Sequence, residues 1–500
     1  MLSKVYAPAL LSLSGEVVEI ECDLANGLPG FLVVGLADKA VDEARERVRS
    51  AIKNSGLLVP PKRITLNLAP ADLPKDGTGY DLAMAVAILV ASNQLPADTV
   101  TTALFLGELA LDGSLRPVKG AVLAAQLARE RAFSHIYVPA ANAAEAAMLP
   151  DVKVIAITSL RELYHHLVGM RPLGVVDHVR IQPDKTALNT VDMGDIYGQQ
   201  QAKRAIEVAA AGGHNILLSG PPGSGKTLMS KALIGLLPPP SFDEMLEVTQ
   251  IYSLAGLNHQ GIMRSRPLRA PHHTASSAAL IGGGSIPRPG EISLSHLGIL
   301  FLDELPEFPR SVLEVLRQPL EDGQVTIARS ARAVSFPARF MLVATRNPCP
   351  CGYYGDDRCC CTAHQVNQYK RRLSGPLLDR IDLVIDVRPV DRRDLIERQS
   401  SEATVIIAER VQRARAIQSQ RFDGSSARLN HQMDNELVRR HCQLQAETLA
   451  LAKQAVSQLR LSARSYLRIL KVARTIADLA DSSNIETEHF SEALQYRSRT

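Results

Sequence analysis

Apolar positions in the first 170 residues follow two periods, one typical of strands and one typical of helices. Short β-branched runs predict strands, and apolar residues spaced three and four apart predict helices between them. The predicted strands are Val17–Cys22, Phe31–Val34, Ile64–Leu68, Leu104–Leu111 and His135–Pro139, and the predicted helices are Ala40–Ser55, Tyr80–Ala91 and Ala121–Arg131. Strands that alternate with helices indicate an α/β domain over residues 1–170.

A second region of the chain repeats this alternation after a stretch without a clear period. Residues 171–190 include Pro172 and Pro183 and are typical of a linker. A second α/β domain is predicted over 191–390, and 391–500 has a helical pattern almost free of glycine. We therefore expect an α/β fold with two such domains, followed by a helical lid.

Composition and charge narrow the class of protein. Five hundred residues suggest about three domains, and 46% apolar with 22% charged residues is ordinary for a globular chain. The longest apolar run, Leu82–Ala91, is far shorter than the roughly 18 residues that a membrane-spanning helix needs. Pro8 interrupts the apolar start, so no signal peptide is expected. Residues 1–170 carry a net charge of −3 and the remainder +7, which permits a polyanionic partner, although solvated helix faces give the same counts.

A strand, a glycine-rich loop and a helix follow one another in the second domain. The buried run Asn215–Ser219 precedes the loop, and the helix Leu228–Leu236 follows it. The loop consists of Gly220, Pro221, Pro222, Gly223, Ser224, Gly225, Lys226 and Thr227. This is the G-x-x-x-x-G-K-[ST] motif in the order of elements that it requires, which argues against a chance turn. Its backbone N–H groups and Lys226 would bind nucleotide phosphates, and the Thr227 hydroxyl would bind Mg²⁺.

Two further predicted strands of this domain end in polar residues. Gly298–Leu302 ends in Asp303 and Glu304, where an aspartate can join the Mg²⁺ shell and a glutamate can polarise the attacking water. The alternative is that Asp303 caps a following helix. Phe340–Ala344 leads to Asn347, whose amide could orient the same water. The sequence therefore predicts a hydrolytic nucleotide site.

An arginine between two aspartates follows these strands. Arg380 lies between Asp379 and Asp382. Such spacing usually marks a surface cluster of ion pairs. The sharper hypothesis is that Arg380 stabilises the charge of phosphoryl transfer in a neighbouring subunit.

Five of the seven cysteines fall within thirteen residues. Cys349, Cys351, Cys359 and Cys361 form two C-x-C pairs that could supply four thiolates to one tetrahedral Zn²⁺, which leaves Cys360 spare. C-x-C is tighter than the usual C-x₂-C, and reduced surface cysteines are the alternative. Cysteine usage of this kind suits a reducing compartment, so a cytoplasmic protein is expected.

Two segments carry clustered basic residues. The insertion 246–290, between the glycine-rich loop and Asp303, contains Arg264, Arg266, Arg269, His272, His273 and Arg288. The predicted hairpin Val325–Phe336 carries Arg329 and Arg332 at its turn. In a ring, such loops can face the pore and bind nucleic-acid phosphates without reading sequence. The alternative is ordinary solvation of the loops or, for the two histidines, packing or a subunit contact.

Taken together, these motifs resemble the ComM/YifB family of magnesium-chelatase-like AAA+ ATPases, over nearly the whole chain. The matching strings are Gly220–Thr227, Arg269–Thr274, Pro289–Leu294, Leu300–Phe308, Asn347–Gly352, Leu373–Asp382, Gly27–Phe31 and Asn67–Leu73. The resemblance implies a ring-forming, hexameric enzyme that uses ATP and Mg²⁺. ComM members are implicated in branch migration of DNA during natural transformation, which implies a helicase-type motor in homologous recombination.

The resemblance also implies roles for single residues. Asn347 would be sensor 1, Arg380 the arginine finger, and Arg468 or Arg464 sensor 2 on the lid. The chain departs from the familiar pattern before sensor 1, where Thr345 and Arg346 stand in place of Ala and Met.

The first domain resembles the Lon-type protease fold. In the string Pro74–Gly79, Gly79 occupies the place of the nucleophilic serine, and Val122 occupies the place of the activating lysine, with Lys119 nearby. Without a nucleophile and its base there is no catalytic dyad. We therefore expect a non-proteolytic scaffold that contacts DNA as one tier of the ring.

Four functions compete at this point. The leading hypothesis is an ATP-driven DNA motor without sequence specificity or membrane association. A chelatase subunit is the first rival, although such subunits resemble 191–500 and generally lack the front domain. An ATP-dependent protease is opposed by Gly79 and Val122. A DNA-binding regulator whose ATPase only controls assembly is not separated from a motor by the sequence.

Overall fold

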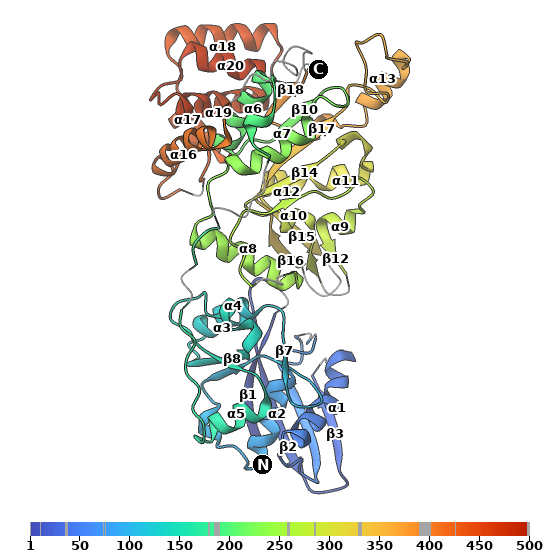
Figure 1. The fold of residues 1–500 in the computed structure, drawn as a ribbon, viewed down its shortest axis with the longest axis vertical. Coiled ribbons are helices and arrows are strands. Elements are labelled where there is room, and N and C mark those ends of the chain that lie inside the picture. Colours follow the sequence, from blue (N-terminus) through green and yellow to red (C-terminus); the bar gives the residue numbers. More distant parts are fainter. Residues whose placement is uncertain are drawn as a thin grey trace. The chain divides into compact units, whose positions relative to one another are not determined.

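Two separate β-sheets organise the chain, and each belongs to its own folded unit (Figure 1). Unit 1 comprises Met1–Pro183, Ser241–Arg264 and Gly284–Pro289, and unit 2 comprises Asp184–Pro240, Ser265–Gly283 and Gly290–Thr500. This computed structural model describes residues 2–10, 12–35, 39–73, 75, 77–178, 181–184, 191–257, 261–284, 287–328, 333–389, 402–425 and 427–497.

Unit 1 is built on a mixed seven-stranded sheet with the order β3-β4-β2-β1-β5-β8-β9. These strands are β1 (Leu2–Ala9), β2 (Glu16–Ala25), β3 (Gly30–Val34), β4 (Arg63–Ala69), β5 (Ala103–Phe105), β8 (His135–Pro139) and β9 (Lys153–Ile157). Strand β2 is antiparallel to both β1 and β4. The row β1-β5-β8-β9 is parallel, which is typical of strands joined by helical crossovers.

Helices from two parts of the sequence complete unit 1. They are α1 (Lys39–Asn54), α2 (Asp81–Ala91), α3 (Ala121–Glu130), α4 (Ala143–Ala146), α5 (Leu160–Leu167) and α8 (Phe242–Ala255), with the short elements β6 (Glu108–Leu109), β7 (Leu115–Arg116) and β13 (Arg288–Pro289). Every residue of α2 is buried, as its unbroken apolar sequence predicts. Helix α8 belongs to this unit because Ser253 accepts a hydrogen bond from the Gly120 backbone (2.8 Å) and Gln250 bonds Gln126 (2.5 Å).

Unit 2 contains a wholly parallel five-stranded sheet with the order β11-β14-β17-β10-β18. The strands are β11 (Leu268–Arg269), β14 (Ile299–Leu302), β17 (Met341–Arg346), β10 (Ile216–Ser219) and β18 (Leu383–Asp386). In the register, Leu302 of β14 lies opposite Ala344 of β17, and Thr345 lies opposite Leu218 of β10. The carboxyl ends of three neighbouring strands therefore meet at one edge of the sheet.

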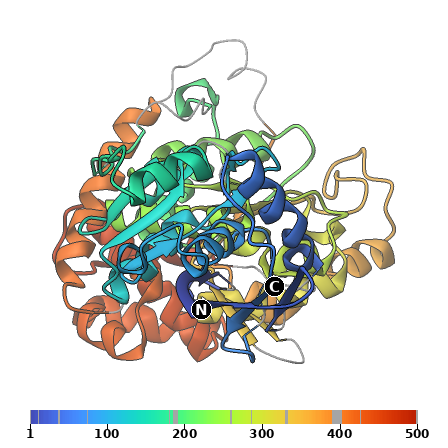
Figure 2. The ribbon, with the colours of Figure 1, turned by 90° about the horizontal axis from the view of Figure 1, so that it is seen from below.

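The remaining elements of unit 2 are mostly short helices around this sheet. They are α6 (Gln200–Gly212), α7 (Lys226–Ala232), α9 (Ser277–Ile281), α10 (Glu291–Leu294), α11 (Arg310–Val315), α12 (Arg317–Asp322), α13 (Ala363–Lys370) and α14 (Gly375–Leu378), with strands β12 (Gly282–Gly283), β15 (Gln324–Ala328) and β16 (Ala333–Pro337). The C-terminal region is helical and consists of α16 (Thr404–Arg421), α17 (Asn435–His441), α18 (Ala446–Gln458), α19 (Ala463–Leu479) and α20 (Thr487–Gln495). These orange and red helices cluster together in both views (Figures 1 and 2).

The predicted fold class is confirmed, since both units are α/β and the C-terminal region is helical. The hairpin Val325–Phe336 is also confirmed as the antiparallel pair β15–β16, although Arg329 and Arg332 lie outside the described residues. The domain boundaries at 170, 190 and 390 stay predictions.

The apolar start forms strand β1, in which Pro8 still pairs with β2. Two local predictions need correction. The run Leu104–Leu111 is two strands, because the Gly107 backbone leaves the sheet to bond Gly79 (3.0 Å). The insertion 246–290 is not one loop, since it contributes α8 to unit 1 and the edge strand β11 to unit 2.

No helix within the described ranges combines the length and the apolar character that crossing a membrane requires.

Candidate functional site

The loop between β10 and α7 holds the predicted phosphate-binding residues. Strand β10 is completely buried, so its end is fixed at the edge where β14 and β17 also end. Gly223 and Gly225 have positive φ angles of 75° and 87°, and an added Cβ at either position would meet nothing within 4 Å. The loop therefore turns around open space with backbone that only glycine adopts easily, which fits a cradle for phosphates.

Lys226 is buried and held by its own loop. Its ammonium donates to the carbonyl oxygens of Gly220 (2.7 Å) and Pro221 (2.8 Å) and to Oδ1 of Asn347 (3.3 Å). Burial lowers the pKa of Lys226, and the nearby carboxylates of Asp303 and Glu304 act in the opposite direction. A phosphate oxygen would replace neutral carbonyl acceptors with a charged one, which is the stronger hydrogen bond.

The carboxylate of Asp303 joins the strand ends of β14 and β17 to the loop. Its Oδ2 accepts from the Thr227 hydroxyl (3.2 Å), and its Oδ1 accepts from the Thr345 hydroxyl (2.5 Å). A hydroxyl and a carboxylate are hard oxygen ligands of the kind that Mg²⁺ prefers, so these two residues fit the predicted metal set. The helix-cap alternative for Asp303 finds no support, since the residue bonds side chains of other elements.

Glu304 and Asn347 face each other beyond this aspartate. The Asn347 amide donates to Oε1 of Glu304 (3.5 Å), and the Glu304 backbone N–H donates to the Thr345 hydroxyl (3.0 Å). Glu304 has a φ of +53°, a left-handed conformation that is rare for a non-glycine residue and often found at functional sites. The structure therefore brings together Lys226, Thr227, Asp303, Glu304 and Asn347.

Thr345 is a residue whose role the sequence did not reveal. Its hydroxyl donates to the carboxylate of Asp303 and accepts from the backbone of Glu304, so it fixes both residues at once. The unusual Thr before Arg346 was the only signal in the sequence that pointed to this position.

Arg380 lies elsewhere in unit 2. Its guanidinium donates to the carbonyls of Arg317 (3.1 Å) and Pro376 (2.5 Å) and pairs with Glu321. None of these partners belongs to the phosphate loop. An arginine that acts on a neighbouring subunit's nucleotide would be placed away from its own site, so its predicted role stays open.

Asn215 ties the segment of Arg380 to the start of β10. Its amide donates to the Arg380 carbonyl (3.0 Å), its backbone N–H donates to Asp382 (3.0 Å), and its Oδ1 accepts from the Leu342 backbone (2.8 Å). Displacement at Arg380 would therefore reach the strand that carries the phosphate loop.

The two candidates for sensor 2 also face the segment of Arg380. Arg468 donates to the carbonyl of Ile381 (2.6 Å), while Arg464 is exposed and lies 4.0 Å from Glu321. Within the described part of the chain, neither makes a hydrogen bond or ion pair to Gly220–Thr227. The choice between them stays a prediction.

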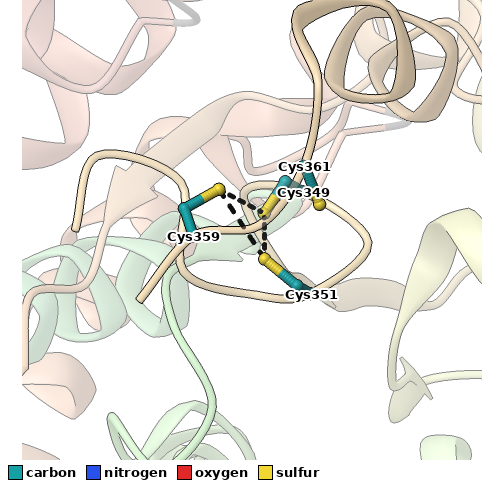
Figure 3. Close-up of side chains that lie close together, drawn as sticks. All are labelled: Cys349, Cys351, Cys359 and Cys361. Carbon is teal, nitrogen blue, oxygen red and sulfur yellow. Dashed lines mark hydrogen bonds between the residues drawn. The ribbon is translucent and has the colours of Figure 1, made fainter. Parts of the chain in front are cut away.

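Four cysteine sulfurs converge in the loop after β17 (Figure 3). The sulfur of Cys349 lies 3.3 Å from that of Cys351 and 3.9 Å from that of Cys359, and Cys351 and Cys359 are 3.7 Å apart. With Cys361, all four sulfurs lie within 4.8 Å of one another. A tetrahedral zinc with Zn–S bonds of about 2.3 Å separates its sulfurs by roughly 3.8 Å, so this set fits zinc.

The thiols of the cluster differ in pKa. The Tyr353 backbone N–H lowers the pKa of the Cys351 thiol to about 6, whereas desolvation and the neighbouring thiols raise the pKa of Cys359, and that of Cys361 to about 12. Cys360, between two members of the cluster, is exposed and lies outside it.

The arginines proposed to bind DNA differ from one another. Arg266 donates to the carbonyls of Pro238 (2.7 Å) and Leu297 (2.8 Å), and Arg269 forms a two-point ion pair with Glu291 (2.6 and 2.7 Å). Both guanidinium groups bond the protein's own chain, and their predicted contact with DNA stays a prediction. Arg264 is exposed. Arg329 lies outside the described residues.

The site that resembles the Lon dyad lies in unit 1 beside a cavity of about 310 Å³. Gly79 and Lys119 line this cavity, whereas Val122 is completely buried. The adjacent Thr78 hydroxyl donates to Glu108. A glycine and a buried valine supply neither nucleophile nor base.

Family models of known proteins match most of the chain. The family model described as magnesium chelatase, subunit ChlI, matches residues 192–395, and its C-terminal counterpart matches 401–497. A third model, described as subunit ChlI of Mg-chelatase, matches residues 20–142.

Curated relatives match from end to end. The chain is 44% identical to the competence protein ComM of Haemophilus influenzae, with 99% of this chain and 97% of that protein covered. It is 43% identical to the uncharacterized protein YifB of Salmonella typhimurium over the same shares. The magnesium-chelatase 67 kDa subunit of Chlorobaculum parvum is 27% identical over 31% of this chain and 23% of that protein.

Proposed function

Because the chain belongs to the ComM/YifB family of magnesium-chelatase-like AAA+ proteins, we propose that it is an ATP-driven motor that remodels branched DNA. The family supports ATP binding and a ring-like assembly. The printed name of the Haemophilus relative, a competence protein, supports a link to DNA uptake. Branch migration in recombination, a hexameric ring and a cytoplasmic location are the finer parts of this proposal.

One observation carries the ATPase part: the polar residues at three neighbouring strand ends contact one another. Lys226 and the backbone of Gly220–Thr227 would hold the β- and γ-phosphates. Thr227 and Asp303 would hold Mg²⁺, which neutralises charge that develops on the phosphates.

Glu304 and Asn347 would then act on the water. Glu304 accepts the proton of the attacking water as general base, and the Asn347 amide fixes the direction of that carboxylate, as its 3.5 Å contact suggests. Thr345 keeps Glu304 in place through the backbone. This division of work supports hydrolysis rather than nucleotide storage.

Arg380 would complete the site of the neighbouring subunit. A charge supplied in trans stabilises phosphoryl transfer and makes hydrolysis depend on ring assembly. The contacts of Arg464 and Arg468 around the same segment support a lid that senses the position of Arg380.

DNA would be bound through its phosphates and without sequence preference. Of the four arginines considered, the exposed Arg264 is the described residue whose charge fits this role best. We also propose one zinc ion per chain on Cys349, Cys351, Cys359 and Cys361, supported by the spacing of their sulfurs.

A chelatase subunit is the second candidate, favoured by the family models. The model that matches residues 20–142 also carries the chelatase description, so the front unit alone does not separate the two functions. A regulator whose ATPase controls assembly is the third.

Strand displacement on a synthetic four-way junction separates these functions. A motor should release product strands only with ATP and Mg²⁺, and Lys226→Ala protein should release none. Release of strands without nucleotide, or equal activity of the variant, would contradict the motor. ATP hydrolysis without strand release would favour the chelatase or regulator.

A further inference from the structure

The cysteine cluster and the nucleotide site share one loop. We define the cysteine loop as Asn347–Thr362, the segment between β17 and α13. It begins with Asn347, which contacts Lys226 and Glu304, and the first ligand, Cys349, follows two residues later. Cys349 is completely buried, so this end of the loop is fixed beside the nucleotide site.

A second contact joins the cysteine loop to the phosphate loop. An added Cβ on Gly352 would lie 2.6 Å from Cδ and 2.7 Å from Cγ of Pro222, so the Gly352 backbone packs against the proline ring with no room for a side chain. Gly352 directly follows Cys351, and its N–H donates to the Cys349 carbonyl (3.0 Å). The turn that carries two of the sulfurs therefore presses against the phosphate loop.

The far end of the loop is also anchored. Cys361 is followed by Thr362, whose side chain and that of Gln365 form a capping box at the start of α13. Between the anchors, residues 353–358 make mostly local turns, such as the Asp356 backbone N–H to the Tyr353 carbonyl (2.9 Å). Residues 354–358 are exposed, so a link between the neighbouring sulfurs would decide the shape of this stretch.

We propose that zinc bound by the cysteine loop positions the nucleotide site, through Gly352 against Pro222 and through Asn347 beside Lys226. This inference rests on the ATP site and the zinc site proposed above. Loss of the metal would loosen both contacts, although Lys226, Thr227 and Asp303 themselves would be unchanged. The cysteine loop would thus set nucleotide affinity and water orientation without touching phosphate.

Two glycines allow a matched test. Gly352 and Gly355 have similar φ angles, +85° and +90°, but an added Cβ on Gly355 would meet nothing within 4 Å. Gly352→Ala should keep one zinc per chain by elemental analysis and bind a fluorescent ADP analogue about tenfold more weakly than wild type. Gly355→Ala carries the same backbone strain and should bind it like wild type.

The outcomes of this pair are decisive. Equal losses in both variants would assign the effect to backbone strain, and wild-type binding by Gly352→Ala would show that the contact with Pro222 does not position the site. Either result overturns the proposal. Binding of the analogue needs neither DNA nor hydrolysis, so failure of the motor in the junction assay is a separate result.

The metal itself is tested with ligand exchange at one cysteine. Cys359→His replaces one zinc ligand by another and should retain zinc and nucleotide affinity, whereas Cys359→Ser should lose both. Cys360→Ser, next to the cluster, is the control and should match wild type. Circular dichroism checks that the serine variant is folded.

Two results would overturn this part. If Cys359→Ser lost zinc but bound the analogue like wild type, the metal would have no positioning role. If wild-type protein purified without added metal were folded, bound the analogue and contained no zinc, the metal site itself would be refuted.

Discussion

Polar side chains are used differently in the two units. In unit 2, at the ends of neighbouring parallel strands, the Thr345 hydroxyl donates to Asp303 and the Asn347 amide donates to Glu304. In unit 1, the turn before α2 carries Gly79, and the hydroxyl of the adjacent Thr78 donates to Glu108. The polar side chains of the two α/β units therefore have different partners, because the residue types at these positions differ.

Buried charge shows the same contrast. Lys226 is held by carbonyls and an amide that a phosphate can replace. Asp81 in unit 1 is held by a two-point ion pair with Arg47 (2.8 and 3.1 Å) and by the Leu109 backbone (3.3 Å). A charge whose partners are exchangeable suits a binding site, whereas a charge saturated by its own chain is held in one position and is costly to leave without its partner.

The largest expected effect concerns Arg380, which tests whether the site of unit 2 is complete within one chain. Arg380→Ala should lower ATP turnover by about 10³-fold or more, because an arginine finger stabilises the transferred phosphoryl group. Mixing it with Lys226→Ala protein should recover activity. At some interfaces, the intact phosphate loop of one subunit then meets the intact Arg380 of its neighbour. Steady-state hydrolysis across mixing ratios measures this, and no recovery in rings shown to be mixed would place Arg380 outside the reaction.

Glu304 tests the chemistry of the strand ends directly. Glu304→Gln should lower turnover by about 10²- to 10⁴-fold, because the amide cannot accept the proton of water. It should still bind the fluorescent nucleotide, whereas Lys226→Ala should not. Comparable hydrolysis by Glu304→Gln and wild type would remove Glu304 from its role as general base.

Much of this contrast could be predicted from the sequence, and the reasons for the remainder are physical. The motif Gly220–Thr227 specifies its own strand, loop and helix, so the nucleotide site was predictable. Strand β11 was not, because two residues are too few to show a period. The partners of Arg266 and Arg269 are brought together by tertiary structure, and local sequence contains no sign of them.

Arg47 tests the structural side of the comparison. Arg47→Ala removes the ion pair of Asp81, whose side chain is only 1% exposed and whose pKa burial already raises to about 6. The carboxyl should then become protonated, and the free energy of unfolding of unit 1 should fall by about 1–3 kcal/mol. Hydrogen exchange of peptides from the two units locates the loss. Arg49→Ala, an exposed position on the same helix α1, is the control. A substantial drop in nucleotide affinity with no loss of protection in unit 1 would contradict the structural role.

Acid should act on unit 2 through His431. Burial and the neighbouring His214 lower the pKa of His431 to about 4, against about 6.5 in an unfolded chain. Between pH 6.5 and 4, His431 is protonated in the unfolded chain but neutral in the folded one. The free energy of unfolding is therefore highest above pH 6.5 and falls as the pH decreases. The free energy of unfolding can fall by at most about 3 kcal/mol through this group. Hydrogen exchange in unit 2 between pH 7 and 4.5 measures it, and His431→Gln should flatten the dependence; an equal slope in the variant would assign it to other groups.

The smallest expected effect concerns which unit binds DNA. Arg264, the last residue of the α8 segment in unit 1, is exposed, whereas Arg266 in unit 2 is bound to backbone carbonyls. If Arg264 contacts a phosphate, Arg264→Ala should reduce the slope of log affinity against log salt by about 0.7 to 0.9, because one fewer counterion is released. Anisotropy of a labelled junction at several salt concentrations measures the slope.

Basal ATP hydrolysis should not change, since Asp303 and Lys226 lie in unit 2. Arg266→Ala should instead destabilise the chain around Pro238 and leave the slope as it is, because its N–H groups already donate to backbone carbonyls. An unchanged slope in Arg264→Ala, with a reduced one in Arg266→Ala, would reverse the assignment and place the DNA path on unit 2.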